Sequence, residues 1–87
     1  SIVGEHADVL DVTVIGVPHE KWGESALALV IPRDGARPDG GEIRDWSNQR
    51  LAKHQRLIGV EFRDEFPRNA LGKVLKRLLR EPYWTAA

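Results

Sequence analysis

The 87 residues of the chain are enough for one domain, near the small end of the range that folds unaided. Its 13 basic and 13 acidic side chains cancel, which argues against a general polyanion binder. Without cysteine, a disulfide framework and a thiolate metal site are excluded, and no apolar run reaches the roughly 20 residues needed to cross a membrane. The three histidines, His6, His19 and His54, are not spaced as metal ligands and are expected at the surface. Because the first residues do not resemble a secretory signal, a cytoplasmic protein is the default expectation.

Two strands are predicted in the first third of the chain. Residues 1–6 are expected to be the end of a helix, and residues 9–17 are rich in β-branched side chains that favour a strand ending at Pro18. Residues 25–32 form the second predicted strand, with apolar side chains on both of its faces. We therefore expect it to be covered on both sides and to pair antiparallel with the first strand.

A helix is predicted over residues 41–53, after a loop rich in glycine and proline. Asp39, followed by Glu42 three residues later, resembles a capping box with aspartate in place of serine or threonine. The buried side of this helix is expected to consist of its large apolar residues, Ile43, Trp46 and Leu51.

The last third is predicted to contain one strand and one helix. After an irregular link over residues 54–58, residues 60–63 alternate cleanly between apolar and charged side chains, which indicates a half-buried strand. Residues 73–80 have the pattern of an amphipathic helix that Pro82 ends, leaving Tyr83 and Trp84 in a tail. The order strand, strand, helix, strand, helix predicts an α+β domain with a three-stranded sheet and helices packed on it.

The stretch from Phe66 to Arg77 carries the strongest functional signal. It reads as a turn ending at Gly72, followed by a cationic helix with Lys73 in its first turn. The helix dipole disfavours a cation there by roughly 0.3–1 kcal/mol, and Arg68 adds to the positive potential. Such a helix start is suited to an incoming phosphate or carboxylate. The alternative, from the residues alone, is a solvated lysine on a basic helix face.

Residues 67–74, Pro-Arg-Asn-Ala-Leu-Gly-Lys-Val, resemble the last signature motif of the adenylate-forming enzymes, which has the form Pro-(Arg/Lys)-x-x-x-Gly-Lys. This family comprises acyl-CoA synthetases, aryl-CoA ligases, luciferases and peptide-synthetase adenylation domains. The resemblance covers nearly the whole chain as their small C-terminal domain. It implies that Lys73 is the catalytic residue of adenylation, its ammonium contacting the substrate carboxylate and the phosphate oxygens of ATP. Gly72 is expected to adopt a positive φ or to approach another surface closely. Arg68 and Asn69 are expected either to position the loop against the large domain or the nucleotide, or to form a solvated turn.

The resemblance also implies positions that bind CoA. Trp22 and Gly23 belong to a stretch similar to one that lies near the pantetheine tunnel of CoA ligases after the small domain rotates. The alternative for Trp22 is partial burial beside the sheet. Arg56 stands where some of these ligases place a basic residue near the nucleotide phosphates of CoA, and Lys53 is a weaker candidate of the same kind. At Ile58, where some have a second lysine, this chain is apolar.

By this resemblance, residues 1–87 are the C-terminal lid domain of an AMP-forming acyl-CoA synthetase, a fragment without its large N-terminal domain and hinge, and inactive alone. The whole enzyme is expected to activate a carboxylic acid with ATP and Mg²⁺, bound mainly by the large domain, and then to transfer the acyl group to CoA. The same small domain is expected to present different faces in the two half-reactions. Which acid is activated cannot be read from this chain, because the acyl pocket belongs to the large domain.

Two alternatives stay open. Within the family, the nearest is a peptide-synthetase adenylation domain, whose acceptor is a carrier protein rather than CoA. From another class, a non-catalytic α+β module would bind RNA or an acidic partner through its basic last helix. The zero net charge stands against that second alternative. The cations of that helix are Lys73, Lys76, Arg77 and Arg80.

Overall fold

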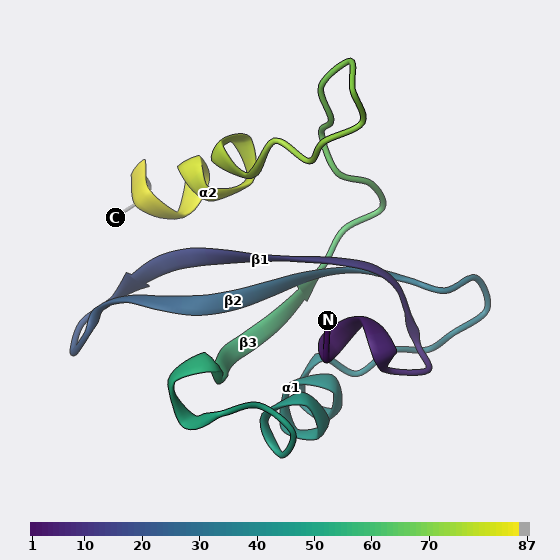
Figure 1. Cartoon of the computed structure of the whole chain (residues 1–87), viewed down its shortest axis with the longest axis horizontal. Helices are drawn as coiled ribbons and strands as arrows, with labels where there is room; N and C mark the ends of the chain where they lie inside the picture. Colours follow the sequence, from purple (N-terminus) through teal and green to yellow (C-terminus); the bar gives the residue numbers. More distant parts are fainter. Residues whose placement is uncertain (86–87) are drawn as a thin grey trace.

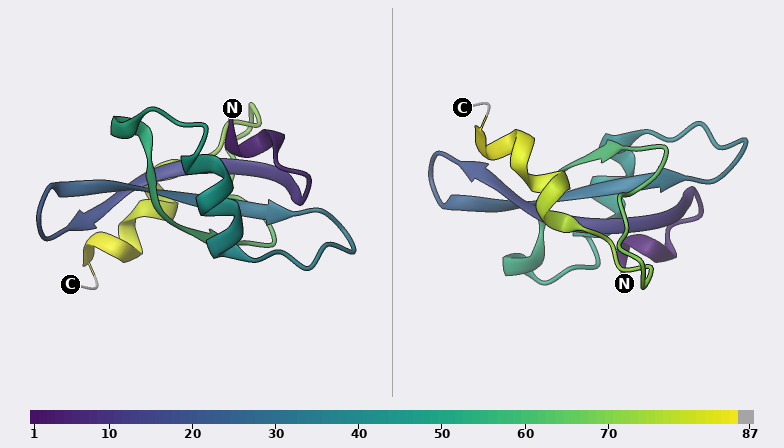
Figure 2. Two further views of the ribbon diagram at one scale, coloured as in Figure 1. Left: turned by 90° about the horizontal axis from the view of Figure 1, so that it is seen from below. Right: turned by 90° about the horizontal axis from the view of Figure 1, so that it is seen from above.

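The computed structural model describes residues 1–85 and shows a three-stranded mixed sheet between two helical layers (Figure 1). β1 (Val9–His19) pairs antiparallel with β2 (Gly23–Pro32), and β2 pairs parallel with β3 (Leu57–Phe62), so β2 is the central strand. α1 (Gly40–Asn48) lies on one face of the sheet and α2 (Lys76–Thr85) on the other (Figure 2). The predicted α+β class, the order of elements and the antiparallel pairing of the first two strands are confirmed.

The central strand β2 contributes to a hydrophobic core on each face of the sheet, as its two apolar faces predicted. Val30 packs in one cluster with Ile43 of α1. Leu27 and Leu29 pack in a second cluster with Phe66, which lies between β3 and α2. All five side chains are buried, and full burial of such a side chain stabilises a fold by roughly 1.5–3 kcal/mol. Each helical layer is therefore held to the sheet by its own core.

β1 departs from a regular strand near its start. Its register shifts just before Asp11, which marks a β-bulge, and Leu10 beside the bulge is exposed. Beyond the bulge, the buried positions include Thr13 and Ile15. The strand also continues one residue past Pro18, where the prediction ended it. Because β1 is an edge strand, a proline there need not remove a ladder hydrogen bond.

α1 is shorter than predicted. The carboxylate of Asp39 caps its N-terminus by accepting hydrogen bonds from the backbone N–H groups of Gly41 (2.9 Å) and Glu42 (3.2 Å). The capping box is not completed, because Glu42 instead contacts His6 through Oε2 and Nε2 at 2.7 Å. The helix ends at Asn48, whose side chain turns toward β3.

His6 is buried, with 6% of its surface exposed, which corrects the expectation of a surface histidine. Its Nδ1 accepts a hydrogen bond from the backbone N–H of Asp8 at 3.1 Å, so Nε2 is the ring atom that faces the Glu42 carboxylate. The Trp46 ring meets the imidazole edge-on, with centroids 5.0 Å apart. These contacts hold the N-terminal 3₁₀ turn η1 (Val3–Glu5) against α1. That single turn is all that the structure shows of the predicted N-terminal helix.

β3 begins at Leu57, earlier than the predicted strand, and the link before it contains a 3₁₀ turn, η2 (Lys53–Gln55). The crossover through α1 returns the chain to the end of the sheet where β2 starts, which permits parallel pairing. Gly40 passes close to β3: a Cβ there would stand 2.9 Å from the carbonyl oxygen of Val60. A side chain at this position would push α1 away from the sheet.

α2 differs most from the prediction, because it begins at Lys76 rather than Lys73 and runs past Pro82. A proline inside a helix removes one backbone hydrogen bond and strains the preceding turn. Two contacts beyond Pro82 offset this cost. The Tyr83 hydroxyl lies within hydrogen-bond distance of Glu61 and Arg63. Trp84, which belongs to the helix rather than to a tail, donates from Nε1 to the carbonyl of Gly16. No helix within residues 1–85 is long and apolar enough to cross a membrane.

Candidate functional site

The segment that we call the lysine loop, residues 67–75, projects from the sheet between β3 and α2 (Figure 1). Arg68 and Val74 form an isolated antiparallel β-bridge, and the backbone N–H of Leu75 donates to the carbonyl of Pro67 at 2.8 Å. The loop is therefore a small hairpin, not the first turn of a helix. Lys73 lies in this hairpin and precedes α2. The prediction that it occupies the first turn of a helix, where the helix dipole disfavours a cation, is therefore wrong.

Hydrogen bonds within the lysine loop define its turn. The N–H of Asn69 donates to the Lys73 carbonyl (3.0 Å), and the N–H of Gly72 donates to the Asn69 carbonyl (2.9 Å). Gly72 has a φ of +87°, which confirms the predicted positive value and matches a three-residue hairpin loop that ends in glycine. The side-chain Oδ1 of Asn69 also accepts from the N–H groups of Leu71 (2.9 Å) and Lys73 (3.0 Å). Asn69 thus holds the backbone on both sides of Gly72.

Arg68 connects the lysine loop to the first strand. Its Nη1 donates to the carbonyl of Gly72 at 2.8 Å, and its Nη2 donates to Oδ2 of Asp11 at 2.7 Å. The other carboxylate oxygen, Oδ1 of Asp11, accepts from the backbone N–H of Val12 at 2.8 Å. In this structure, the predicted loop residue Arg68 is therefore engaged within the chain. Its contact with the large domain or the nucleotide stays a prediction.

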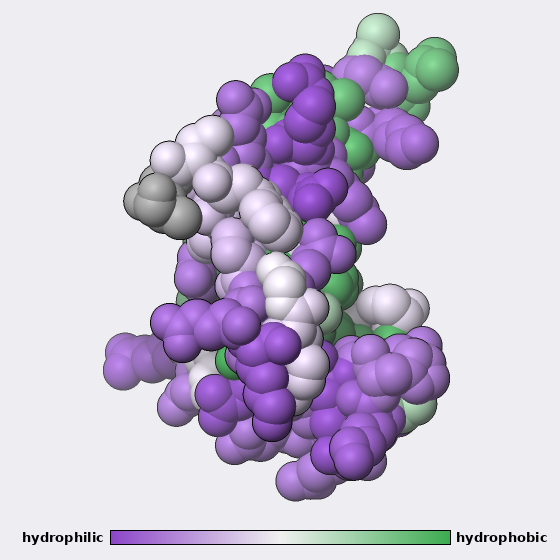
Figure 3. Space-filling model, turned by 90° about the vertical axis from the view of Figure 1, so that its left-hand side faces the viewer, coloured by the Kyte–Doolittle hydropathy of each residue, from purple (hydrophilic) through white to green (hydrophobic). Residues whose placement is uncertain are grey.

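Lys73 and Leu71 are two of the exposed side chains of the lysine loop. Leu71 is 93% exposed, and Lys73 is exposed as well. Among residues 1–85 no carboxylate pairs with the Lys73 ammonium. Apolar atoms show at the projecting end of the molecule, above a largely polar body (Figure 3). Hydrogen bonds within the loop and the contact of Arg68 with Asp11 hold its backbone. The Lys73 ammonium, unpaired among residues 1–85, is accessible to an anionic ligand.

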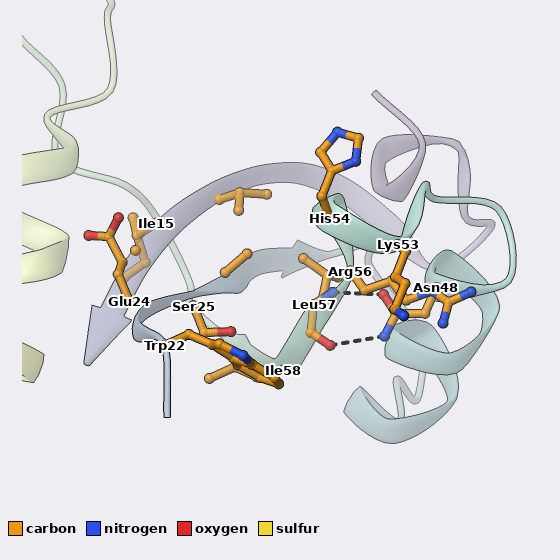
Figure 4. A pocket seen from close by; sticks show the side chains of 13 residues that line it. Ile15, Trp22, Glu24, Ser25, Asn48, Lys53, His54, Arg56, Leu57 and Ile58 are labelled. Carbon is orange, nitrogen blue, oxygen red and sulfur yellow. Dashed lines mark hydrogen bonds between the residues drawn. The ribbon is translucent and has the colours of Figure 1, made fainter. Parts of the chain in front are cut away.

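A second candidate region is a groove of about 1030 Å³ beside the β1–β2 hairpin (Figure 4). Trp22, Lys53 and Arg56, three residues predicted to lie on the CoA side, all line it. Gly23 does not line the groove; it is the first residue of β2 and has a φ of +76°. The structure thus brings together candidates that are distant in the sequence. We call this region the hairpin groove.

Trp22 stands at the tip of the β1–β2 hairpin and is 65% exposed, so the alternative of partial burial beside the sheet is wrong. The His19 ring stacks on it, with centroids 4.5 Å apart and planes 19° from parallel. The Nδ1 of His19 accepts from the backbone N–H of Lys21 at 3.1 Å, and the Lys21 ammonium lies 5.3 Å from the indole centroid. Neighbouring residues therefore hold this exposed aromatic ring in place.

Asn48, at the end of α1, shapes the inner side of the hairpin groove. Its Nδ2 donates to the carbonyl of Leu57 at 2.9 Å, and its Oδ1 accepts from the N–H of Leu57 at 2.8 Å (Figure 4). These two bonds satisfy the backbone N–H and carbonyl of Leu57, the first residue of β3, and they link it to the last residue of α1. It also fixes the course of η2, which carries Lys53 and leads directly to Arg56.

The charges of the hairpin groove are unevenly distributed. Lys53, His54 and Arg56 lie on the η2 side and are exposed. Of the described residues that line the groove, Glu24 is the only acid, and it pairs with Arg80 of α2 (Oε1–Nη2 3.1 Å). Ile58 adds an exposed apolar side chain where a lysine occurs in some CoA ligases. The η2 side is therefore suited to an anionic group.

α2 joins the two regions, since it follows the lysine loop and packs near the β1–β2 hairpin at its other end (Figure 1). Near that end, Nε1 of Trp84 donates to the carbonyl of Gly16 at 2.9 Å. The basic face predicted for this helix is not assembled as expected. Lys73 lies outside the helix, and Arg80 is paired with Glu24. This weakens the alternative of a basic helix that binds RNA.

Tyr83 fastens α2 to the opposite edge of the sheet. Its hydroxyl lies 2.6 Å from Nη2 of Arg63 and donates to the Glu61 carboxylate. Burial raises the pKa of Tyr83 above its usual value of 10.0, and the hydrogen bond to Glu61 raises it further, while Arg63 opposes the change. The neutral phenol is thus the form that the folded chain favours.

Sequence reasoning missed three residues that organise these regions: Asp11, Asn48 and His19. Asp11 is a charged residue in an otherwise apolar strand, but its partner lies 57 positions away and gives no local signal. Asn48 is nine positions from Leu57 and reads as an ordinary polar residue near a helix end. His19 precedes Trp22 by three positions, and that spacing was the one available hint.

Comparison with known proteins agrees with this geometry. The model of the AMP-binding enzyme C-terminal domain matches residues 1–73. A feruloyl-CoA synthase from an Amycolatopsis species is 44% identical over 70 residues, covering 80% of this chain and 14% of that protein. An indoleacetate–CoA ligase from Aromatoleum aromaticum is 38% identical over 81 residues, covering 93% of this chain and 16% of that protein.

A solved structure has the same fold. The crystal structure of ATP-bound MatB from Rhodopseudomonas palustris superposes with a TM-score of 0.85 at 37% identity, covering 93% of this chain and 16% of that chain. The present chain thus spans about 14–16% of the length of the relatives described here. It belongs to the family of AMP-binding enzyme C-terminal domains, the small domain of adenylate-forming acyl-CoA synthetases.

Proposed function

We propose that residues 1–87 are the C-terminal lid domain of an ATP-dependent, AMP-forming acid–CoA ligase whose large N-terminal domain and hinge precede this chain. Relatives that carry the domain are named feruloyl-CoA synthase, indoleacetate–CoA ligase and 3-methylmercaptopropionyl-CoA ligase. In the first half-reaction, a carboxylate oxygen attacks the α-phosphorus of ATP and pyrophosphate leaves. In the second, the CoA thiol attacks the acyl carbonyl and AMP leaves.

Lys73 is the residue that we assign to the first half-reaction. The carboxylate and the triphosphate are both anions, so charge concentrates between them as they approach. A fixed ammonium placed there stabilises the transition state more than the separated reactants. The observation that carries this assignment is an exposed Lys73, unpaired among residues 1–85, on a loop that is closed by its own hydrogen bonds. No proton transfer is needed for this role.

The hairpin groove is the region that we assign to the second half-reaction. Trp22 offers an exposed apolar ring of the kind that can pack against the pantetheine arm, and Arg56 and Lys53 offer cations for the nucleotide phosphates of CoA. Because the lysine loop and the groove lie at different ends of the sheet, one domain can present them in turn by rotating as a rigid body. The two half-reactions then use different surfaces of this chain.

ATP reaches this chain only through the proposed closure on the large domain. Within residues 1–85 no three His, Asp or Glu side chains gather as a metal site. The chain's own contribution to charge neutralisation is the Lys73 ammonium. From the family resemblance, we expect the large domain to hold both the nucleotide and its Mg²⁺.

A carrier protein is the second candidate acceptor. A relative named fatty acid–[acyl-carrier-protein] ligase, from Streptomyces coeruleorubidus, is 33% identical over 84 residues and covers 97% of this chain. The acceptor of that protein is attached to a carrier and does not bring the adenine nucleotide of CoA. The basic η2 side of the hairpin groove therefore favours CoA, and the two acceptors can be compared directly by supplying each with a preformed acyl-adenylate.

The test uses the full-length enzyme and separates the half-reactions. Adenylation is measured as acid-dependent exchange of pyrophosphate into ATP, and thioester formation is measured from preformed acyl-adenylate and CoA. Lys73→Ala is expected to slow adenylation by roughly 10²–10³-fold, as does the loss of one preorganised charge-stabilising donor elsewhere. Thioester formation should change little.

Lys76→Ala is the matched control, since Lys76 is an exposed lysine three residues away, at the start of α2. It should leave both half-reactions near the wild-type rate. Equal adenylation rates in Lys73→Ala, Lys76→Ala and wild-type enzyme would return Lys73 to the role of a solvated surface lysine.

A further inference from the structure

The contact between Asp11 and Arg68 joins the lysine loop to the bulge in β1. The two residues are 57 positions apart, and their side chains meet at 2.7 Å. Both partners have a second bond that orients them. Asp11 accepts from the N–H of Val12 at 2.8 Å, and Arg68 donates to the Gly72 carbonyl at 2.8 Å. The result is a continuous path from the β1 backbone to the residue that precedes Lys73.

This path depends on the planar guanidinium of Arg68. Its two terminal nitrogens donate in different directions, one to the loop backbone and one to the Asp11 carboxylate. A lysine has a single ammonium on a flexible stem, so it cannot hold both acceptors with the same geometry. Arg68 is paired with Asp11, which leaves Lys73 as the cation of the loop without an ionic partner in residues 1–85.

We propose that Asp11 is a positioning residue for adenylation, acting through Arg68 to hold the Gly72–Lys73 segment of the lysine loop at the orientation in which Lys73 reaches its anionic ligand. The inference rests on the proposed function of Lys73. Asp11 itself contacts no reacting group in this scheme. It sets how often the loop occupies the competent arrangement, and so it acts on the adenylation rate and leaves the thioester half-reaction alone.

The experiment compares Asp11→Asn with wild type in the full-length enzyme. Asparagine keeps the shape of the side chain and an oxygen for the Val12 N–H, but loses the charge that binds Arg68. Because the pair is exposed, we expect the adenylation kcat to fall about two- to fivefold. The KM values for ATP and acid, and the rate of thioester formation, should stay within error of wild type.

Three further variants make the result specific. Arg68→Lys is expected to reduce adenylation to a similar degree, and the double variant Asp11→Asn/Arg68→Lys should lose no more than the worse single variant, because both changes break one path. Asp45→Asn is the matched control. It removes an exposed carboxylate that pairs with Arg44 at 3.0 Å on α1, far from the lysine loop along the chain. It should change neither half-reaction.

Amide hydrogen exchange provides a readout independent of catalysis. In Asp11→Asn, the peptide covering residues 67–75 should exchange about two- to fivefold faster, while the β2 peptide keeps its protection. Suppose that the loop exchanges faster in Asp11→Asn but Lys73→Ala does not slow adenylation. This result would contradict the proposed function of Lys73, while the link from Asp11 through Arg68 to the loop would stand. Unchanged loop exchange and an unchanged adenylation kcat in Asp11→Asn, beside a strong Lys73→Ala defect, would overturn the role of Asp11 alone.

Discussion

The lysine loop and the hairpin groove are built in opposite ways. Most hydrogen bonds of the lysine loop join residues within positions 67–75, and Asn69 and Gly72 define its turn. The groove is assembled from the β1–β2 hairpin, the end of α1, the η2 turn and the start of β3. One region is encoded by a short run of sequence, and the other exists only when the whole sheet has formed.

This difference has a consequence for how each region tolerates change. A substitution within residues 68–73 of the lysine loop is expected to alter the loop and little else, since these residues are exposed and bond mainly to one another. A substitution that disturbs the frame of the groove acts on contacts between elements, and thus on the stability of the domain. The following predictions test that contrast, beginning with the largest expected effect.

Asn48→Ala should be the most destabilising of these changes. It removes both side-chain bonds to Leu57 and leaves a partly buried N–H and carbonyl without those partners. We expect the free energy of unfolding to fall by about 2–3 kcal/mol, measured by urea denaturation. Asn69→Ala, which also removes two bonds to backbone groups but at an exposed site, should cost less than about 1 kcal/mol. An Asn69→Ala loss as large as that of Asn48→Ala would break the contrast.

Gly72→Ala and Gly23→Ala form a matched pair. Both glycines have positive φ, +87° and +76°, and an added Cβ would meet nothing within 4 Å at either site. Backbone strain alone should therefore lower the free energy of unfolding by about 1 kcal/mol in each variant. Only Gly72→Ala should also slow adenylation, because a change in the backbone at position 72 alters the orientation of Lys73. If Gly23→Ala slowed adenylation equally, the loop could not be considered an independent unit.

Arg56→Ala should have a smaller effect, confined to CoA. Its side chain is exposed, so its attraction to a phosphate is screened by solvent. We expect the KM for CoA in thioester formation to rise about two- to fivefold, more at low salt than at high salt, with adenylation unchanged. Arg77→Ala, at an exposed position on α2, serves as the control and should leave this KM alone. A salt-independent change in KM would exclude a phosphate contact by Arg56.

Tyr83→Phe should have a small effect at neutral pH, from the loss of the hydroxyl's bonds to Glu61 and Arg63, and a distinctive effect in alkali. The folded chain raises the pKa of Tyr83 above 10.0, so the unfolded chain releases this proton first as pH increases. The stability that the neutral phenol contributes is complete below pH 10 and is lost as pH rises through the higher folded-state pKa. Urea denaturation from pH 9 upward should therefore show a steeper loss of stability in wild type than in Tyr83→Phe. Parallel pH profiles would contradict this.

Local sequence patterns predicted the strands better than the ends of the helices. The apolar faces of β2 were correct because period-two alternation depends only on strand geometry. α2 was placed too early, since residues 73–75 are compatible with a helix but their backbone groups bond to Pro67 and Asn69. Its continuation past Pro82 depends on the contact of Trp84 with Gly16, which no local pattern reveals.

The candidate sites divide in the same way. Gly72 and the exposed Lys73 could be predicted because a motif of fixed spacing encodes the lysine loop. Resemblance assigned Trp22 and Arg56 to CoA separately, and no local signal predicted that they line one groove, because this requires β2 and β3 to begin at the same end of the sheet. Asp11 was missed for the same reason, since only the folded sheet brings it to Arg68.

The internal bonding of the lysine loop also affects the thermodynamics of each catalytic cycle. Ordering a flexible segment costs roughly 1–2 kcal/mol per residue in backbone entropy. In the lysine loop that cost is met once, when the chain folds, through the bonds of Asn69 and the left-handed Gly72. The proposed approach of Lys73 to its ligand then requires ordering of little more than the lysine side chain. Binding energy from the substrates is thereby left for closing the domain and for the chemical step.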